Sequence, residues 1–162
     1  MITHACQARE LFEKGYNCSQ SVFAAFCDET GMELETALKI SSSFGGGMGR
    51  LREVCGAVTA MFMIAGIKYG YTDPRDDVKK AEHYKRIQAL AFKFKERNGS
   101  YICRDLLDMV GTDNPIPKAR TDEYYQTRPC EQLVGIAAEI MDEVINRKSL
   151  EHCCFEKNKR TV

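Results

Sequence analysis

Apolar side chains recur three and four positions apart along almost the whole chain, and this spacing limits the fold more than any other feature. The spacing is that of amphipathic α-helices. No segment alternates apolar and polar residues over the length of a typical strand, and the chain contains no internal repeat. We therefore expect an all-α protein that forms a single-domain bundle of about five to seven helices.

Glycines and a capping residue divide the N-terminal part into short helices. Gly15 ends a first helix, and Asn17 is a good N-cap for a second helix that stops at Gly31. A third helix is expected from Glu33 to about Ser43. The following residues, SSSFGGGMGR, are too rich in glycine and serine to stay regular, so they predict a flexible loop.

Two longer helices are expected to form the centre of the bundle. One runs from about Arg52 to Tyr69 and is apolar on most sides. The other begins at Asp73-Pro74, where an N-cap acceptor precedes proline at the first helical position, and ends at Asn98-Gly99. This long central helix is expected to bury one face, made of Val78, Ala81, Ile87, Leu90, Ala91 and Phe94.

The C-terminal part is expected to hold a short helix capped by Ser100, a loop from Gly111 to about Asp122, and a last helix from about Pro129 to Asn146. Residues 1–150 then form one domain, and residues 151–162 form a polar C-terminal tail.

Charge and hydropathy exclude several classes of partner. The 162 residues include 23 basic and 23 acidic side chains, so no basic surface for nucleic acid is expected. The most apolar stretch, Ala57 to Ile67, is much shorter than the roughly 20 residues of a bilayer span, which argues against membrane insertion. The N-terminus lacks the features of a secretory signal. We expect a cytoplasmic protein, and the apolar central helix favours a homodimer.

The chain has eight cysteines, which is many for a cytoplasmic protein. A reducing cytoplasm disfavours structural disulfides, so metal binding, redox chemistry or reactive thiols become the main interpretations. Four of the eight fit ordinary core or tail positions: Cys6, Cys27, Cys153 and Cys154.

The other four cysteines are placed at expected helix starts. Cys18 directly follows Asn17, Cys103 is third after Ser100, and Cys130 is third after Thr127; Cys55 follows the glycine-rich loop. The first turn of a helix has unpaired N–H groups and a positive dipole end, so a thiol there is expected to have a lowered pKa, with Arg104 and Arg128 adding to the effect. Spacing alone also allows four structural cysteines, because short C-x-x-C pairs are absent.

Several segments together resemble a known family. They are GYNCSQSVFAAF, SSSFGGGMGRLREVCGAVTAMFMIAGIKYG, Cys103 before Arg104-Asp105-Leu106, and Arg128-Pro129-Cys130. The chain resembles, from about Gly15 to Ile145, the bacterial and archaeal family of redox-active proteins named for its C…GCAxxG…C…C pattern. Two departures are visible: cysteine precedes glycine in Cys55-Gly56-Ala57, and Ala60 stands where the pattern closes with glycine.

The resemblance implies a redox-active protein without an agreed reaction, with Cys18, Cys55, Cys103 and Cys130 as its four defining cysteines. Our leading hypothesis is that they bind an iron–sulfur cluster for electron transfer with a redox partner protein not identified by the sequence. One alternative is a structural four-thiolate zinc site. The other is metal-free chemistry, in which two of the thiols cycle between dithiol and disulfide.

Overall fold

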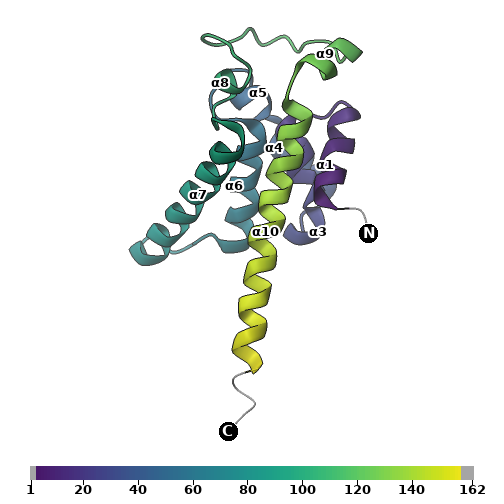
Figure 1. Ribbon diagram of the computed structural model, residues 1–162. Helices are drawn as coiled ribbons and strands as arrows, with labels where there is room; N and C mark the ends of the chain where they lie inside the picture. The colour runs from purple at the N-terminus through teal and green to yellow at the C-terminus, as the bar shows by residue number, and fades with distance from the viewer. Residues whose placement is uncertain (1–2, 158–162) are drawn as a thin grey trace.

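The computed structural model describes the backbone of residues 3–157 and the side chains of residues 3–146 (Figure 1). Over this part of the chain the structure is helical and contains no strand, which confirms the all-α expectation. The helices outnumber the expected five to seven, because one-turn segments separate the longer ones. They are α1 (His4–Glu13), α2 (Cys18–Ala25), α3 (Cys27–Thr30), α4 (Leu34–Ser42), α5 (Gly45–Met48), α6 (Gly56–Tyr69), α7 (Asp77–Asn98), α8 (Cys103–Leu106), α9 (Asp122–Thr127) and α10 (Cys130–Lys157).

The core lies where α6 and α10 pack with α1 and α2. Helix α6 is buried on most sides, as its sequence predicted, and Met61 and Ile64 are inaccessible to solvent. Phe12 of α1, Phe23 of α2 and Met141 of α10 fill the same core. Burial of such large apolar side chains supplies most of the driving force for folding.

Helix α7 differs from the long central helix that the sequence predicted. Only Leu90, Ala91 and Phe94 are buried, all in its C-terminal half. Val78 is 70% exposed, and the N-terminal end of the helix extends away from the bundle (Figure 1). The apolar pattern of this helix therefore indicated its helical period correctly but overestimated the length of its buried face.

Two helix starts show how capping decides the boundaries. Asn17 caps α2 as predicted: its side chain accepts a hydrogen bond from the Gln20 N–H, and the Gln20 side chain accepts one from the Asn17 N–H. The start of α7 was predicted at Asp73-Pro74, but Asp76 is the N-cap. Asp73 instead accepts a hydrogen bond from the Arg75 N–H, which forms a turn before the helix.

The glycine-rich segment is ordered rather than a flexible loop. It contains α5, and Gly46, Gly47 and Gly49 take positive φ angles there. The non-glycine residues Met48, Arg50 and Arg52 share this backbone region, which an L-residue rarely adopts. A residue in this conformation cannot begin an α-helix, so α6 does not start at Arg52 as predicted; it starts at Gly56.

The last helix begins close to the predicted residue and continues beyond it. Helix α10 starts at Cys130 and reaches Lys157, so its backbone enters the segment predicted as a tail. The side chains of Cys153 and Cys154 lie outside the described residues. None of the helices in the described part of the chain combines the length and the apolar character that a bilayer span requires.

Candidate four-cysteine site

The four cysteines selected from the sequence all line one cavity of about 300 Å³. The cavity also takes residues from α5, α8 and the chain around α9, which lie together at the upper end of the bundle in Figure 1. Cys55, Cys103 and Cys130 are buried, and Cys18 is half-buried. Cys18 and Cys130 are separated by 112 positions in the sequence and are thus brought to the same cavity.

Each of the four cysteines lies at a helix start. Cys18, Cys103 and Cys130 are the first residues of α2, α8 and α10, and Cys55 is the N-cap residue of α6. For Cys103 and Cys130 the sequence predicted the third position after a cap, because Ser100 and Thr127 were taken as N-caps. Ile102 is the N-cap of α8, and Thr127 ends α9. The prediction that these thiols lie at helix starts is confirmed, but Cys103 and Cys130 are the first residues of their helices rather than the third.

A short backbone pairing brings Cys55 and Cys103 together. Val54 and Ile102 form an isolated antiparallel bridge. On either side of it, the Cys55 N–H donates to the Tyr101 carbonyl at 2.9 Å, and the Cys103 N–H donates to the Glu53 carbonyl at 2.6 Å. This pairing was not predicted, because two residues on each side give no periodic signal in a sequence.

Glycines at the site permit the close approach of its segments. A Cβ atom added to Gly47 would lie 2.6 Å from the Cys103 Cβ, and one added to Gly56 would lie 2.8 Å from the Phe44 carbonyl oxygen and 3.2 Å from the Cys18 Sγ. The distances of 2.6 Å and 2.8 Å are both shorter than those that real Cβ atoms show. The glycines therefore set how near α5 and α6 come to the two thiol-bearing helix starts.

Burial shifts the pKa of Cys55, Cys103 and Cys130 in the opposite direction to the one predicted. Burial first, and the neighbouring Cys18 second, raise the pKa of Cys130 to about 12 and that of Cys55 well above its usual value. Burial also raises the pKa of Cys103, against the opposing effect of Arg52. Helix starts and nearby arginines were expected to lower these values, but the loss of water around the charged thiolate outweighs them.

Arg52 connects one of these thiols to a distant loop. Its side chain is only 2% exposed; Nη1 donates to the Cys103 Sγ at 3.6 Å and Nη2 to Asp113 Oδ2 at 2.8 Å. Arg50 binds the same carboxylate oxygen at 2.7 Å. The loop between α8 and α9 is thereby fastened beside the cavity. Sequence reasoning missed Asp113, because nothing marks it among the polar residues of that loop.

Asp113 makes the free energy of unfolding depend on pH. Its hydrogen bond from Arg52 lowers the pKa of this carboxyl from 3.8 to about 2. A carboxyl with a lowered pKa in the folded state stabilises the fold above the unfolded value, and this stability is lost as the pH falls through the folded value. We expect the difference in free energy of unfolding between wild-type protein and Asp113→Asn to be full above about pH 4 and to vanish near pH 2. Urea unfolding across this range measures it, and a difference that does not change with pH would contradict the assignment.

The two arginines predicted to assist the thiols have separate positions. Arg128 lines the cavity, and its guanidinium lies 4.8 Å from the centre of the Tyr124 ring. Arg104 does not line the cavity; it donates to the Glu53 carboxylate at 2.9 Å. Neither Cys6, which is exposed, nor Cys27, which is half-buried, lines the cavity, so neither belongs to the group of four.

The four thiols line the same cavity, and Cys18, Cys103 and Cys130 are all near enough to Cys55 to raise its pKa. Among residues 3–146, no group of three or more His, Cys, Asp or Glu side chains is arranged to hold a single metal ion. The donor set nevertheless consists of four sulfurs in one cavity, which is the ligand type that iron–sulfur clusters require. The chemistry of this donor set therefore fits a cofactor held by four thiolates.

Comparison with known protein families identifies most of the chain. A family model described as "Putative redox-active protein (C_GCAxxG_C_C)" matches residues 16–144. No curated protein and no solved structure matches the chain significantly.

Proposed function

Since the chain belongs to the C_GCAxxG_C_C family of redox-active proteins, we propose that Cys18, Cys55, Cys103 and Cys130 bind an iron–sulfur cluster, of the two-iron type, for electron transfer. The observation that carries this proposal is the position of all four thiols on one cavity. They come from four helix starts that are far apart in the sequence, and the other two described cysteines lie elsewhere.

The arrangement of the thiols favours a two-iron cluster over zinc. A structural zinc ion needs four donors at one point, with zinc–sulfur distances of about 2.3 Å. In a two-iron cluster each iron takes two protein thiolates, so no three thiols have to meet at one ion. Among residues 3–146 no three such donors are grouped around one point, and a two-iron cluster does not impose that condition.

The surroundings of the thiols suit a negatively charged cofactor. The cavity is lined by Arg50, Arg52 and Arg128, and the N-terminal ends of α2 and α10 face it through Cys18 and Cys130. Positive charge of this kind stabilises thiolates once a metal has displaced their protons. When bound, the cluster supplies a one-electron redox centre, and the nearby cations raise its reduction potential.

The first test is the content of iron and acid-labile sulfide, with a visible spectrum, in protein purified without oxygen. We expect iron and sulfide in equal amounts, with visible absorption. Zinc alone would replace the proposal by a structural site. If neither metal is found, even after reconstitution of protein with eight titratable thiols, the proposal fails and thiol/disulfide chemistry takes its place.

Serine substitutions test which cysteines form the site. In each of Cys18→Ser, Cys55→Ser, Cys103→Ser and Cys130→Ser we expect iron per chain to fall by more than half, because a hydroxyl is a poor ligand for this cofactor. Cys6→Ser is the matched control, since Cys6 is exposed and lies outside the cavity, and it should keep the wild-type iron content. Equal losses in the control and in the four variants would contradict the assignment.

A further inference from the structure

The wall of the four-cysteine cavity carries an excess of positive charge. Five basic side chains line it: Arg50, Arg52, Lys118, Arg120 and Arg128. No aspartate or glutamate is among the lining residues. Asp113 neutralises part of this charge from beside the cavity, through its ion pairs with Arg50 and Arg52.

The remaining three cations have no acidic partner among the described side chains. Arg120 and Arg128 lie against aromatic rings, with the Arg120 guanidinium 4.4 Å from the centre of the Phe12 ring and 4.6 Å from that of Tyr124. The Arg120 Nη2 donates to the Tyr16 carbonyl at 3.1 Å, which fixes its position without neutralising it. Lys118, on the neighbouring loop, is exposed.

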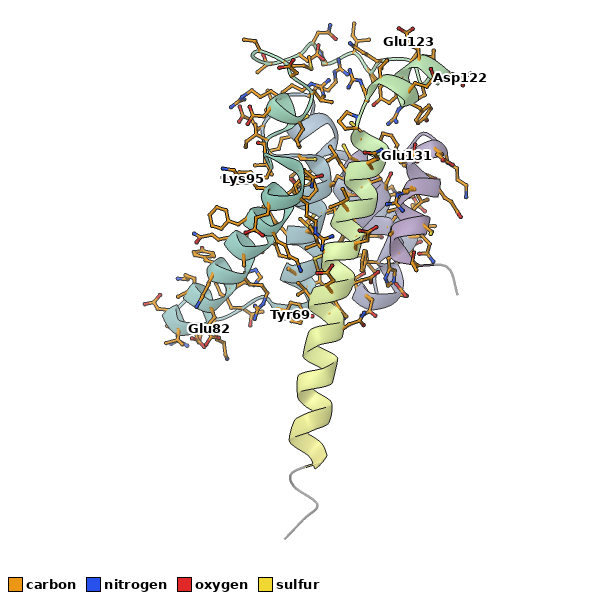
Figure 2. All side chains as sticks on the ribbon, in the orientation of Figure 1. Tyr69, Glu82, Lys95, Asp122, Glu123 and Glu131 are labelled. Atoms are coloured by element: carbon orange, nitrogen blue, oxygen red, sulfur yellow. The ribbon has the colours of Figure 1, made fainter. Side chains whose placement is uncertain are left out.

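Acidic side chains near these cations in the sequence do not compensate them. Asp122 and Glu123 are exposed, and Figure 2 shows them at the outer end of α9. Glu131 follows Cys130 on α10 but does not line the cavity. The positive charge of Lys118, Arg120 and Arg128 at the cavity is therefore not neutralised by these acidic residues.

Two buried donors at this wall lack acceptors. Neither the Arg52 Nε nor the Arg120 Nη1 has a hydrogen-bond partner among the described residues, although each atom is buried. The Arg52 side chain is 98% buried as a whole, so its orientation is fixed by the fold. A buried donor without an acceptor is costly, so these two arginines keep a hydrogen-bonding capacity that the described residues do not use.

We propose that this cavity binds a small molecule with a doubly charged oxyanion group, held by Arg120 and Arg128 and presented to the four thiols. Planar guanidinium groups are well suited to bind such oxygens with two hydrogen bonds. Leu106, Leu107 and Pro117 line the same cavity and leave room for a short apolar portion of the ligand. The inference rests on the proposed function, because it names the substrate class of the same redox site.

The test uses the full chain, reduced and free of metal, titrated with inorganic phosphate or sulfate against chloride at constant ionic strength. Calorimetry should show saturable binding of one anion per chain. Arg128→Gln should weaken it at least tenfold, which corresponds to about 1.4 kcal/mol. Arg75→Gln is the matched control, because Arg75 is 88% exposed and is not among the residues that line the cavity. No saturable binding, or equal weakening in the control, would overturn the proposal.

A second variant separates binding from folding. Arg120 also supports Tyr16 and Phe12, so Arg120→Gln is compared with Arg120→Lys, which keeps the charge and loses the planar group. We expect both to bind the anion more weakly than wild-type protein and Arg120→Lys to bind it more tightly than Arg120→Gln. Variants that bind as well as wild-type protein would overturn the proposal even if their stability changed.

Iron and sulfide analysis on the same preparations distinguishes this inference from the proposed function. If iron and sulfide are bound but phosphate and sulfate do not bind the metal-free chain, the positive wall serves only the cofactor, and the oxyanion proposal fails alone. If the anion binds but no iron or sulfide is found after reconstitution, the cluster proposal fails, and the cavity remains an oxyanion site beside free thiols.

Discussion

Replacing Gly47 by alanine is expected to displace Cys103 and to lower the free energy of unfolding by about 2–4 kcal/mol. Two effects add. The φ angle of Gly47 is +69°, which strains any residue with a Cβ, and the new Cβ would meet the Cys103 Cβ at 2.6 Å and the Glu53 nitrogen at 2.9 Å. The second contact is with backbone that pairs directly with Cys103, so the chain cannot relieve it by a side-chain rotation. Urea unfolding measures the loss of stability, and iron content measures the displacement of Cys103.

Gly31 provides the matched control for this prediction. Its φ angle is +66°, but a Cβ added there would meet no atom within 4 Å. Gly31→Ala should therefore show the backbone strain alone, about 1–2 kcal/mol, with the iron content unchanged. If the two variants lose equal stability and bind equal iron, close packing of Gly47 against Cys103 has no role in forming the site.

The positions of the four cysteines at helix starts could be predicted because capping is a local signal. Asn17 and its capping partner Gln20 lie three residues apart, so the sequence specified the start of α2 and with it the position of Cys18. The start of α10 was also close to its predicted residue. These boundaries depend on neighbours in the chain, and sequence patterns report such neighbours well.

The assembly of the cavity depended on contacts that have no local signal. The bridge between Val54 and Ile102 and the ion pairs of Asp113 join residues about 50 to 60 positions apart. The positive φ of Arg52 is equally hidden, because arginine carries no preference for it. The sequence therefore specified which thiols begin helices, and the tertiary contacts determined that they share a cavity.

The pKa values of the thiols could not be predicted for the same reason: they depend on tertiary contacts that have no local signal in the sequence. Helix dipoles and adjacent arginines are visible in the sequence and lower a thiol pKa, whereas burial depends on every segment packed around the site. At Cys55 and Cys130 burial is the largest influence and it raises the pKa. An expectation built from the local influences alone therefore had the wrong direction.

Replacing Arg52 by methionine is expected to lower the free energy of unfolding by about 2 kcal/mol and to reduce the iron content of the site. Methionine keeps the apolar length of the side chain but removes the hydrogen bonds to Asp113 and to the Cys103 Sγ. Asp113 would keep its ion pair with Arg50, which limits the loss. Arg104→Met is the matched control: Arg104 adjoins Cys103 in sequence, but its ion pair with Glu53 is partly exposed, and such pairs contribute less than about 1 kcal/mol.

A double-mutant cycle with Asp113→Asn tests whether Arg52 acts through this carboxylate. If it does, the double variant should lose clearly less stability than the sum of the two single variants, because each substitution alone breaks the same ion pair. Additive losses would show that the two residues stabilise the protein independently. In that case Arg52 supports the site only through its contact with Cys103, and the loop that carries Asp113 would not need to be fastened for the four thiols to share one cavity.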